Sequence, residues 1–309
     1  MQTSSPSIKT NRLYLYSIIA LVVFIWGTGY PLMNYAIYQK GFPAEWMPAV
    51  RTTLPALAVT AYLYMRGLKL PPLKDKRWFW FALMGFFGMT APFYLIAKGF
   101  ELGVESGMAS ILVNGAMPLF TIILAHFFVR AERLSWRVTI GFITGTFGVI
   151  VLFLPEDLNW SFIDNWSAQG VMLSVGLSYA LAAIVAKRAP ETPASIGAAI
   201  MLITASITAL MIAAPSGLPT NAFPSGVIIA LFALSIIYTG VSDILYLEII
   251  KRSGPSMIGK INYIIPVFTV IFGILFLHEG FSWRTIAAMM IIITGLLIAR
   301  ISEEPNDGK

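Results

Sequence analysis

The chain has 309 residues, of which 57% are hydrophobic and 12% are charged, with a mean hydropathy of +0.77. A soluble domain carries about 25% charged residues, so this composition excludes a soluble globular protein, and equally a disordered one. The absence of cysteine excludes disulfides, thiolate metal sites and thiol catalysis. The net charge of +6 is better explained as a membrane-topology signal than as a nucleic-acid surface.

Ten apolar runs follow one another along the chain, and a transmembrane helix needs about 20 such residues. The runs are interrupted by Gly and Pro, but they lack the alternating pattern of a β-barrel. The predicted fold is therefore an all-α polytopic membrane protein with ten transmembrane helices. The runs cover residues 13–38, 44–65, 78–97, 106–129, 137–154, 168–186, 193–214, 225–247, 255–277 and 284–301.

Lysine and arginine are distributed unevenly over the connections between these runs. With the N-terminus in the cytoplasm, sixteen of the 21 basic residues fall on the cytoplasmic side and three on the outer side. This agrees with the positive-inside rule and predicts that both termini are cytoplasmic. Residues 1–12 are polar, and no cleavable signal peptide is expected.

Sequence motifs in the first half recur in the second half. Residues 114–121 and 262–269 share the pattern N-x-x-x-P-x-F-T, and in both halves a Glu-x-x-Ser-Trp-Arg segment follows. The other matches pair Gly88–Leu95 with Gly240–Leu247, and Trp26-Gly27 with Tyr179-Ala180. Because five helices per unit is an odd number, the second unit is inverted, which is typical of secondary transporters. Duplication into a merely larger bundle is the alternative.

The repeat divides the chain into five parts. Two five-helix units of related sequence are joined by an extracytoplasmic linker, and short polar segments flank them at both ends. The predicted parts are a cytoplasmic N-terminal segment (1–12), the first unit (13–155), the linker (156–167), the second unit (168–301) and an acidic cytoplasmic tail (302–309).

In these features the chain resembles the drug/metabolite transporter superfamily, in its EamA-domain branch. The resemblance is carried by the tandem halves, Trp26-Gly27, Arg51 and the paired N-x-x-x-P segments with their Glu-x-x-Ser turns. It implies a central cavity lined by the first four helices of each half, with the fifth and tenth helices at the periphery, where they can support dimers. It implies small metabolites as substrates without specifying one, and Lys260 departs from the expected small or neutral residue.

Matching prolines lie within the fourth helix of each half. A proline removes the hydrogen bond to the carbonyl four residues earlier, and that residue is Asn114 for Pro118 and Asn262 for Pro266. Each asparagine offers a freed carbonyl and an amide at mid-membrane depth. We expect the prolines to be hinges and the asparagines to line the substrate site. A kink stabilised by interhelical bonding alone is the alternative.

Three charged residues lie within the predicted helices. Asp243 and Lys260 fall at similar depth on adjacent helices, where an unpaired charge costs roughly 2.5–3.5 kcal/mol. They are predicted to pair, either permanently or with Lys260 binding an anionic substrate group and Asp243 acting as counter-ion or titrating group. Arg51, about 10 Å deep, either binds a carboxylate or braces its neighbours, and we favour bracing.

Aromatic residues are expected both at the centre and at the membrane interfaces. Rings with polar tips bind amphipathic or cationic solutes, and Tyr94 and Tyr246 are favoured because the repeat places them at equivalent positions. The central set is Trp26, Tyr30, Tyr94, Tyr179 and Tyr246. Trp46 is assigned to the interfacial belt. The Gly141-x-x-x-Gly145 motif marks either a dimer face or intramolecular packing.

The sequence lacks P-loop, H-E-x-x-H and G-x-S-x-G motifs. It therefore predicts no enzyme, no catalytic residue, no cofactor and no metal site. We expect a secondary active transporter of the bacterial inner membrane that moves a small organic metabolite, an amino acid or related compound, with export as the expected direction. Import of a small amine or quaternary ammonium compound and a channel are the alternatives. The expected partners are this substrate, protons as a candidate coupling ion and the lipid bilayer, with no nucleic acid, in a monomer or homodimer.

Overall fold

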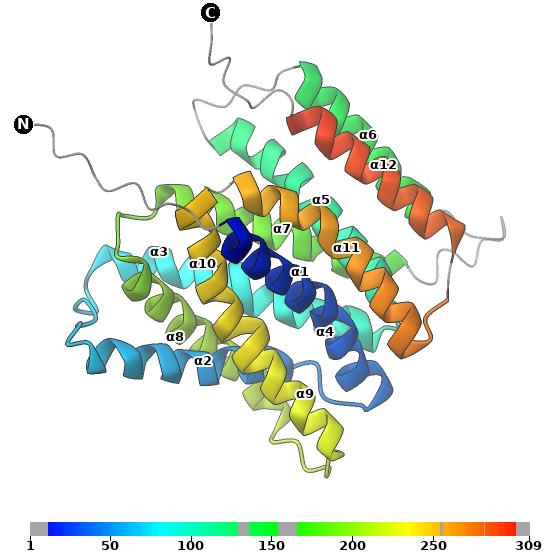
Figure 1. Cartoon of the computed structure of the whole chain (residues 1–309). Coiled ribbons are helices and arrows are strands. Elements are labelled where there is room, and N and C mark those ends of the chain that lie inside the picture. The colour runs from blue at the N-terminus through cyan, green and yellow to red at the C-terminus, as the bar shows by residue number, and fades with distance from the viewer. Residues whose placement is uncertain (1–11, 129–135, 154–165, 254–255, 281, 301–309) are drawn as a thin grey trace, which may run out of the picture.

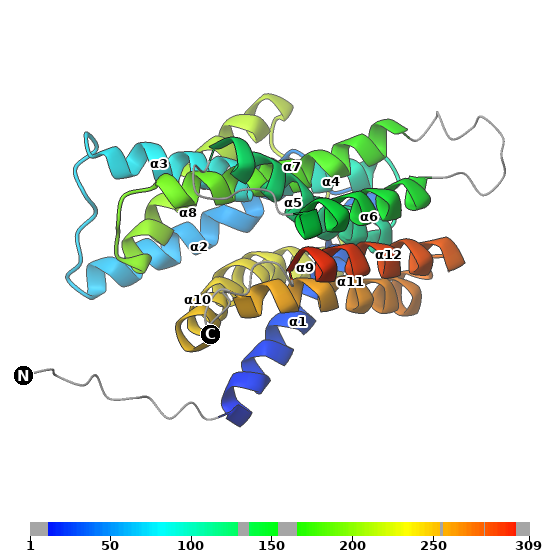
Figure 2. The same cartoon turned by 90° about the horizontal axis from the view of Figure 1, so that it is seen from above.

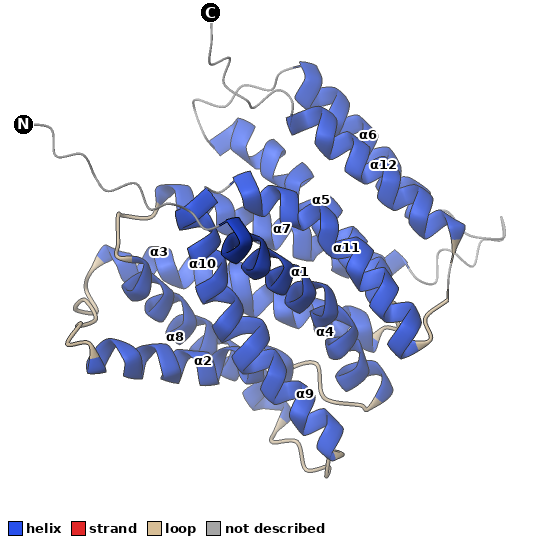
Figure 3. Cartoon of the chain, in the orientation of Figure 1, coloured by secondary structure: helices blue, strands red, loops and turns tan. Residues whose placement is uncertain are grey.

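The computed structural model describes residues 12–128, 136–153, 166–253, 256–280 and 282–300. Every element in these ranges is helical (Figures 1 and 3), which confirms the all-α class for this part of the chain. Passage of all ten predicted helices through the membrane, and the side on which the termini lie, remain predictions. The stretches that are long and apolar enough to cross a membrane are Arg12–Gln39, Lys76–Glu101, Trp166–Ala186, Ala194–Ser216 and Ser225–Tyr246.

The helices of the two halves follow the same order. The first half contains α1 (Arg12–Asn34), η1 (Tyr35–Gln39), α2 (Trp46–Met65), α3 (Lys76–Gly85), η2 (Phe86–Thr90), α4 (Ala91–Glu101), α5 (Ser106–Phe128) and α6 (Trp136–Phe153). The second half contains α7 (Trp166–Arg188), α8 (Ala194–Ala213), η4 (Ala214–Ser216), α9 (Ser225–Ser235), η5 (Ile236–Val241), α10 (Ser242–Ser253), α11 (Ser256–Leu277) and α12 (Trp283–Arg300).

A π-helical segment interrupts the third helix of each half. α3, η2 and α4 form one continuous rod, and α9, η5 and α10 form another, with the wider π turns in the middle of each. The repeated motif beginning at Gly88 and Gly240 falls on these two segments. Because a π turn is a local departure from the α-helical hydrogen-bond pattern, it is often associated with functional sites.

The connections between helices gather at two ends of the bundle. The Trp46 end carries the connections at residues 40–45, 102–105, 217–224 and 278–280, and the Arg66 end carries those at 66–75 and 189–193. Polar contacts tie the connections of the Trp46 end together: Trp46 Nε1 donates to the Gly217 carbonyl at 2.8 Å, and Asn34 Nδ2 donates to the Val104 carbonyl at 3.1 Å. Trp46 thus joins the two halves of the chain, a role beyond that of an interfacial anchor.

Glycines in the left-handed conformation end α2 and α4. Gly67 has a φ of 68° and Gly103 a φ of 84°, a region that L-residues with a side chain avoid. The amide after each glycine donates to a carbonyl five residues back, Leu68 to Leu63 at 2.9 Å and Val104 to Gly99 at 3.0 Å. This bonding satisfies carbonyls that would otherwise have no partner at the helix end.

The two halves pack through pseudo-equivalent helix pairs. The first helix of each half packs on the fourth helix of the other, as α1 on α11 and α7 on α5, and the second helices pack on each other as α2 on α8. Small residues allow the close approach, since a Cβ built on Gly27 would lie 2.7 Å from Phe268 Cβ, and one built on Gly176 would lie 2.9 Å from Ala116 Cβ. The arrangement follows the sequence repeat.

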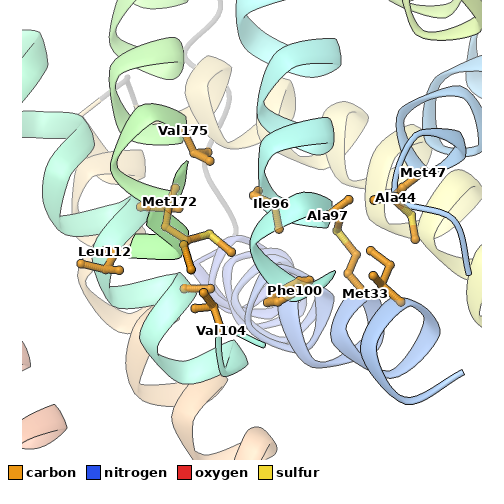
Figure 4. Packing of buried hydrophobic residues seen from close by; sticks show 14 of the residues in the cluster. Met33, Ala44, Met47, Ile96, Ala97, Phe100, Val104, Leu112, Met172 and Val175 are labelled. Carbon is orange, nitrogen blue, oxygen red and sulfur yellow. The ribbon is translucent and has the colours of Figure 1, made fainter. Parts of the chain in front are cut away.

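A large hydrophobic core fills most of the Trp46 end, and a small cluster of Ala49, Ala209 and Ala213 packs beside it against Trp46. The buried residues of the large core come from both halves, and Figure 4 shows Met33 and Met47 against Phe100 and Ala97, with Met172 and Val175 of α7 packed beside them. Val227 and Leu234 of α9 complete the same cluster from the second half. This end of the bundle is therefore a single packed unit.

At the Arg66 end, the described buried residues form two separate clusters. One joins α1 to α10 and α11 through residues such as Val22, Ile249 and Ile261, and the other joins α2, the η2 region and α8 through Met89 and Leu202. Seen from above, α2, α3 and α8 lie on one side of the molecule and α1, α10 and α11 on the other (Figure 2). The two ends of the bundle therefore differ in how the halves are packed.

The last helices of the two halves, α6 and α12, pack along each other at the edge of the bundle (Figure 1). A Cβ built on Gly295 would lie 2.5 Å from the Gly145 amide nitrogen and 2.6 Å from the Gly141 carbonyl oxygen. The Gly141-x-x-x-Gly145 motif is therefore used in packing within the chain, the second of the two interpretations given above. We call this contact the α6–α12 seam.

Substitution Gly295→Ala is expected to destabilise the protein, because the new methyl group has no room against the α6 backbone. Overpacking of this kind costs about 1–3 kcal/mol, so the melting temperature of detergent-purified protein should fall by several degrees. The neighbouring Thr294→Ala exchange alters an exposed side chain and serves as the matched control. Equal melting temperatures for the two variants would contradict the close approach.

Candidate substrate site

A polar contact joins α1 to η5 near the middle of the bundle. The hydroxyl oxygens of Thr28 and Tyr238 lie 2.7 Å apart, and Thr28 Oγ1 also donates to the Phe24 carbonyl at 2.7 Å. Because the single proton of Thr28 is committed to that carbonyl, Tyr238 is the donor in the shared bond. Gly29 permits the approach, since a Cβ there would lie 3.1 Å from the Tyr238 ring.

The Arg51 guanidinium binds groups from several helices. Its Nε and Nη2 each donate to Thr239 Oγ1 at 3.3 Å, and Nη2 also donates to the Tyr238 carbonyl at 3.4 Å. Its Nη1 lies 3.2 Å from the Met33 sulfur, and its Cζ lies 3.7 Å from the centre of the Phe93 ring. These contacts fit the favoured prediction that Arg51 braces its neighbours, here across the two halves.

The π segment η5 orients the Thr239 hydroxyl for its contact with Arg51. Thr239 Oγ1 donates to the Leu234 carbonyl, five residues earlier, at 3.0 Å. Its proton is therefore used within the helix, and its lone pairs face the guanidinium of Arg51. A cation held against a buried ring and fixed acceptors is stabilised by roughly 2 kcal/mol when it is removed from water.

Tyr30 brings together the residues of the candidate site. Its side chain hydrogen-bonds to that of Asn114, and the side chains of Tyr179 and Arg51 lie nearby. Asn114 Nδ2 also donates to the Ser110 carbonyl at 2.8 Å and to Ser110 Oγ at 3.2 Å. These residues come from α1, α2, α5 and α7, so the first helices of both halves contribute to one polar cluster. We call Tyr30, Arg51, Asn114, Tyr179 and Tyr238 the central cluster.

The π segment η2, in the third helix of the first half, makes the contacts that correspond to those of η5. Ser178 of α7 donates through Oγ to the Phe87 carbonyl of η2 at 2.8 Å. Thr90 Oγ1 donates to the Ala205 carbonyl of α8 at 2.9 Å and lies 2.8 Å from Thr208 Oγ1. In each half, therefore, the π segment of the third helix is bonded to the first and second helices of the other half.

Two of the predicted aromatic residues meet outside the central cluster. The rings of Trp26 in α1 and Tyr246 in α10 lie 6.0 Å apart at an angle of 41°, on the Arg66 side of Tyr30. Tyr94 of α4 lies beside Lys98, whose Nζ is 5.9 Å from its ring centre. The described contacts thus place Tyr94 toward the Trp46 end, apart from its repeat partner Tyr246.

Several predicted residues have side chains outside the described part of the structure. These are Asp243, Lys260, Asn262 and Pro118, so the pairing of Asp243 with Lys260 stays a prediction. The backbone is helical through all four positions, and α11 continues on both sides of the buried Pro266. Among the described residues, His, Asp and Glu side chains nowhere gather in a group that would hold a metal ion.

The sequence reasoning missed Tyr238, Thr239 and Thr28. Tyr238 and Thr239 directly precede Gly240, where the repeated motif begins, and Thr28 directly follows Trp26-Gly27. Proximity to the repeat was therefore an available signal. What the sequence could not show is the π segment, because its residues are as apolar as those of an ordinary helix.

A charged group lies outside the apolar core at the Trp46 end. Lys98 Nζ contacts Glu45 Oε1 at 2.5 Å and Glu101 Oε2 at 2.6 Å. The hydrogen bond from Lys98 holds the pKa of Glu45, in the connection before α2, below its usual value. All three residues belong to the first half and are partly exposed, so the group stabilises that half locally.

The fold and the cluster define a helical membrane protein of two related halves with partly buried polar groups near its centre. Comparison with known families assigns its class: residues 13–154 and 166–301 match the EamA-like transporter family. The chain belongs to this family, which confirms the resemblance noted from the sequence.

Relatives in bacteria and plants support this assignment. The inner membrane transporter YedA of Escherichia coli strain K12 is 23% identical over 287 residues, covering 92% of this chain and 88% of YedA. The transporter YoaV of Bacillus subtilis is 23% identical, over 91% of this chain and 94% of its own. The chloroplastic WAT1-related protein At3g02690 of Arabidopsis thaliana is 22% identical, over 93% of this chain and 70% of its own.

A solved crystal structure shares the fold. It aligns with 94% of this chain and 99% of its own length at a TM-score of 0.63 and 19% sequence identity. At this identity the likeness concerns the arrangement of helices alone.

The contact between Arg51 and Thr239 predicts coupled mutational effects. Residues in direct contact show interaction energies of about 0.5–3 kcal/mol in double-mutant cycles. We expect Arg51→Lys and Thr239→Val each to lower the unfolding free energy in detergent, and the double variant to lose less than the sum of both. Thr60→Val is the control partner, because Thr60 is on the same helix as Arg51 but is bonded to the Ala56 carbonyl; its effect should add to that of Thr239→Val. Additive effects of Arg51→Lys and Thr239→Val would contradict the contact between Arg51 and Thr239.

Proposed function

We propose that this protein is a secondary active transporter that moves a small organic metabolite across the membrane by alternating access. The substrate binds at the central cluster, between the first helices of the two halves. The class of compound is an amino acid or related metabolite, and the direction is export. Membership of a transporter family supports transport itself, and the cluster supports the site.

The observation that carries the proposal is the contact between both halves at Tyr30. Partly buried side chains of α1, α2, α5 and α7 lie near one another there: Tyr30, the Arg51 guanidinium, the Asn114 amide and Tyr179. Buried polar groups away from water are costly unless they are bonded to each other or to a ligand. A site shared by both halves is what alternating access requires, because motion of one half against the other then changes its exposure.

The distribution of basic residues supplies the orientation. The Arg66 end carries Arg66, Lys69, Lys74, Lys187 and Arg188, and by the positive-inside rule it lies in the cytoplasm. With this orientation all ten helices cross the membrane and both termini are cytoplasmic. The proposed location is the bacterial inner membrane, as in the related inner membrane transporter YedA.

Two other functions would use the same bundle. Import of a small amine or quaternary ammonium compound is favoured by the ring faces of the central tyrosines, which attract cations. A channel would need a continuous polar path, whereas most of the Trp46 end is filled by a large hydrophobic core. The tests below separate these functions by the ligand that binds and by the kinetics of its movement.

The substrate class is tested by thermal stability and then by counterflow. Purified protein is heated with single amino acids, small amines and quaternary ammonium compounds, since a ligand of the folded state raises stability. A compound that raises the melting temperature is then preloaded into proteoliposomes. A carrier accumulates labelled compound against its preloaded form, whereas flux without this trans-stimulation would indicate a channel.

Tyr30→Phe is expected to weaken binding of the compound so identified. Loss of the hydroxyl removes one hydrogen bond that the proposed site makes to the compound, worth about 0.5–1.5 kcal/mol, so the dissociation constant should rise up to about tenfold. Tyr64→Phe, whose side chain is exposed at the end of α2, is the matched control. Equal affinities in the two variants would remove Tyr30 from the site.

The prolines of α5 and α11 are the proposed hinges of the motion. Replacing Pro118 and Pro266 together by alanine restores two helical hydrogen bonds and should slow exchange in the counterflow assay more than it weakens binding in the thermal assay. Unchanged exchange rates in the double variant would refute the hinge role.

A further inference from the structure

The N-terminus of α5 is capped by a carboxylate from the opposite half of the chain. The amides of Ser106 and Gly107 donate to Glu279 at 2.6 and 3.2 Å, and Ser106 Oγ donates to Glu279 Oε2 at 2.9 Å. α5 has no acidic residue in its own first turn. The first amides of a helix lack acceptors within that helix. Here the carboxylate of Glu279, 173 residues away along the chain, is the acceptor.

The connection between α11 and α12 is shaped to present this carboxylate. His278, directly before Glu279, has a φ of 56°, a left-handed conformation that is uncommon for residues other than glycine. The Glu279 amide donates back to the Gly273 carbonyl at 3.2 Å. Together they turn Glu279 back over the end of α11 toward α5.

Glycines on both helices make room for the contact. A Cβ on Gly273 of α11 would collide with the Glu279 carboxylate and would lie 2.9 Å from Ser106 Oγ. A Cβ on Gly107 of α5 would lie 3.1 Å from the Val270 side chain. α5 and α11 are the fourth helices of the two halves, so this contact closes the pseudo-symmetric centre of the bundle at the Trp46 end.

The hydrophobic packing shows which end is closed. At the Trp46 end a large core from both halves and a small cluster of Ala49, Ala209 and Ala213 both pack against Trp46, whereas the other two described clusters lie on opposite sides toward the Arg66 end. With the Arg66 end in the cytoplasm, the protein is closed toward the outside. The Glu279 cap lies at this closed end. There the charged carboxylate of one half binds the helix N-terminus of the other.

We propose that Glu279, bound to the N-terminus of α5, is a latch that holds the outer end closed and must be released when the transporter opens outward. The proposal rests on the proposed alternating access. A carboxylate is suited to this role because its bonds to backbone amides are charge-assisted and gain from the positive end of the helix dipole. The bonds are strong while the carboxylate is bound to the helix N-terminus. When they break, the carboxylate and the backbone amides can be solvated by water.

The test measures distances between spin labels at both ends of the full-length protein in nanodiscs. The chain has no native cysteine, so each introduced cysteine is labelled uniquely. One pair replaces Lys40 and Leu218, exposed residues of the two halves at the Trp46 end, and the other replaces Leu73 and Glu191 at the Arg66 end. Electron paramagnetic resonance gives the distance distribution of each pair without any substrate.

Glu279→Ala should shift the 40–218 pair toward longer distances and the 73–191 pair toward shorter ones. The outward-open fraction should rise roughly tenfold, which corresponds to about 1.4 kcal/mol. Glu279→Gln, which keeps an acceptor without the charge, should give a smaller shift in the same direction. Glu101→Gln, which removes an exposed carboxylate bonded to Lys98 within one half, should leave both distributions unchanged.

Two outcomes overturn the proposal. Unchanged distances in Glu279→Ala mean that the cap does not hold the outer end closed, and broadening of both pairs together means that it only stabilises the fold. If Glu279→Ala fails to fold, the same criteria apply to Glu279→Gln. Because no transport is measured, a correlated shift in a protein that shows no counterflow would retain the latch and refute the carrier mechanism.

Discussion

In an apolar environment every backbone hydrogen bond must be made within the protein, and this constraint decides where the two halves are able to bind each other. Within a regular helix the backbone N–H and C=O groups are already hydrogen-bonded to each other. Most backbone groups that take part in polar contacts between the halves lie where the helical pattern is interrupted: the Tyr238 and Phe87 carbonyls lie in the π segments, and the Ser106 and Gly107 amides lie at a helix start. The Gly217 carbonyl serves in the same way beyond the end of η4. The Ala205 carbonyl, which accepts from Thr90 within regular α8, is an exception.

The two halves use the same kinds of contact but are not packed identically. The π segments η5 and η2 each bond to the first two helices of the other half, η5 through Thr28 and Arg51 and η2 through Ser178 and the α8 backbone. The described hydrophobic clusters, in contrast, meet at Trp46 at one end and lie apart toward the other. A polar framework of approximate symmetry combined with asymmetric packing is what one state of an alternating-access carrier requires, because the exchanged packing gives the other state.

Much of the fold and part of the site followed from residue patterns. The apolar runs gave the all-helical class, the repeat singled out Asn114 and Tyr179, and Tyr30 was expected on a helix that faces the centre; α5 does contact both α1 and α7. Tyr238 escaped notice because its importance depends on a π segment, which arises from packing between helices rather than from local preference. Glu279 was visible only as part of a repeated turn, since nothing in its neighbourhood shows that its partner is the start of α5, 173 residues away. The sequence therefore predicted the helices but not the contacts between the two halves.

The α6–α12 seam has a consequence for biosynthesis. α12 leaves the ribosome after the other helices of the second half, so during their synthesis the glycine face of α6 lacks its α12 partner. A helix with such a face binds another helix readily in lipid, including the α6 of a neighbouring nascent copy. The α12 helix of the same chain and the α6 helix of another copy then compete for the glycine face of α6. The amount of correctly assembled protein should therefore depend on how densely new copies are inserted into the membrane.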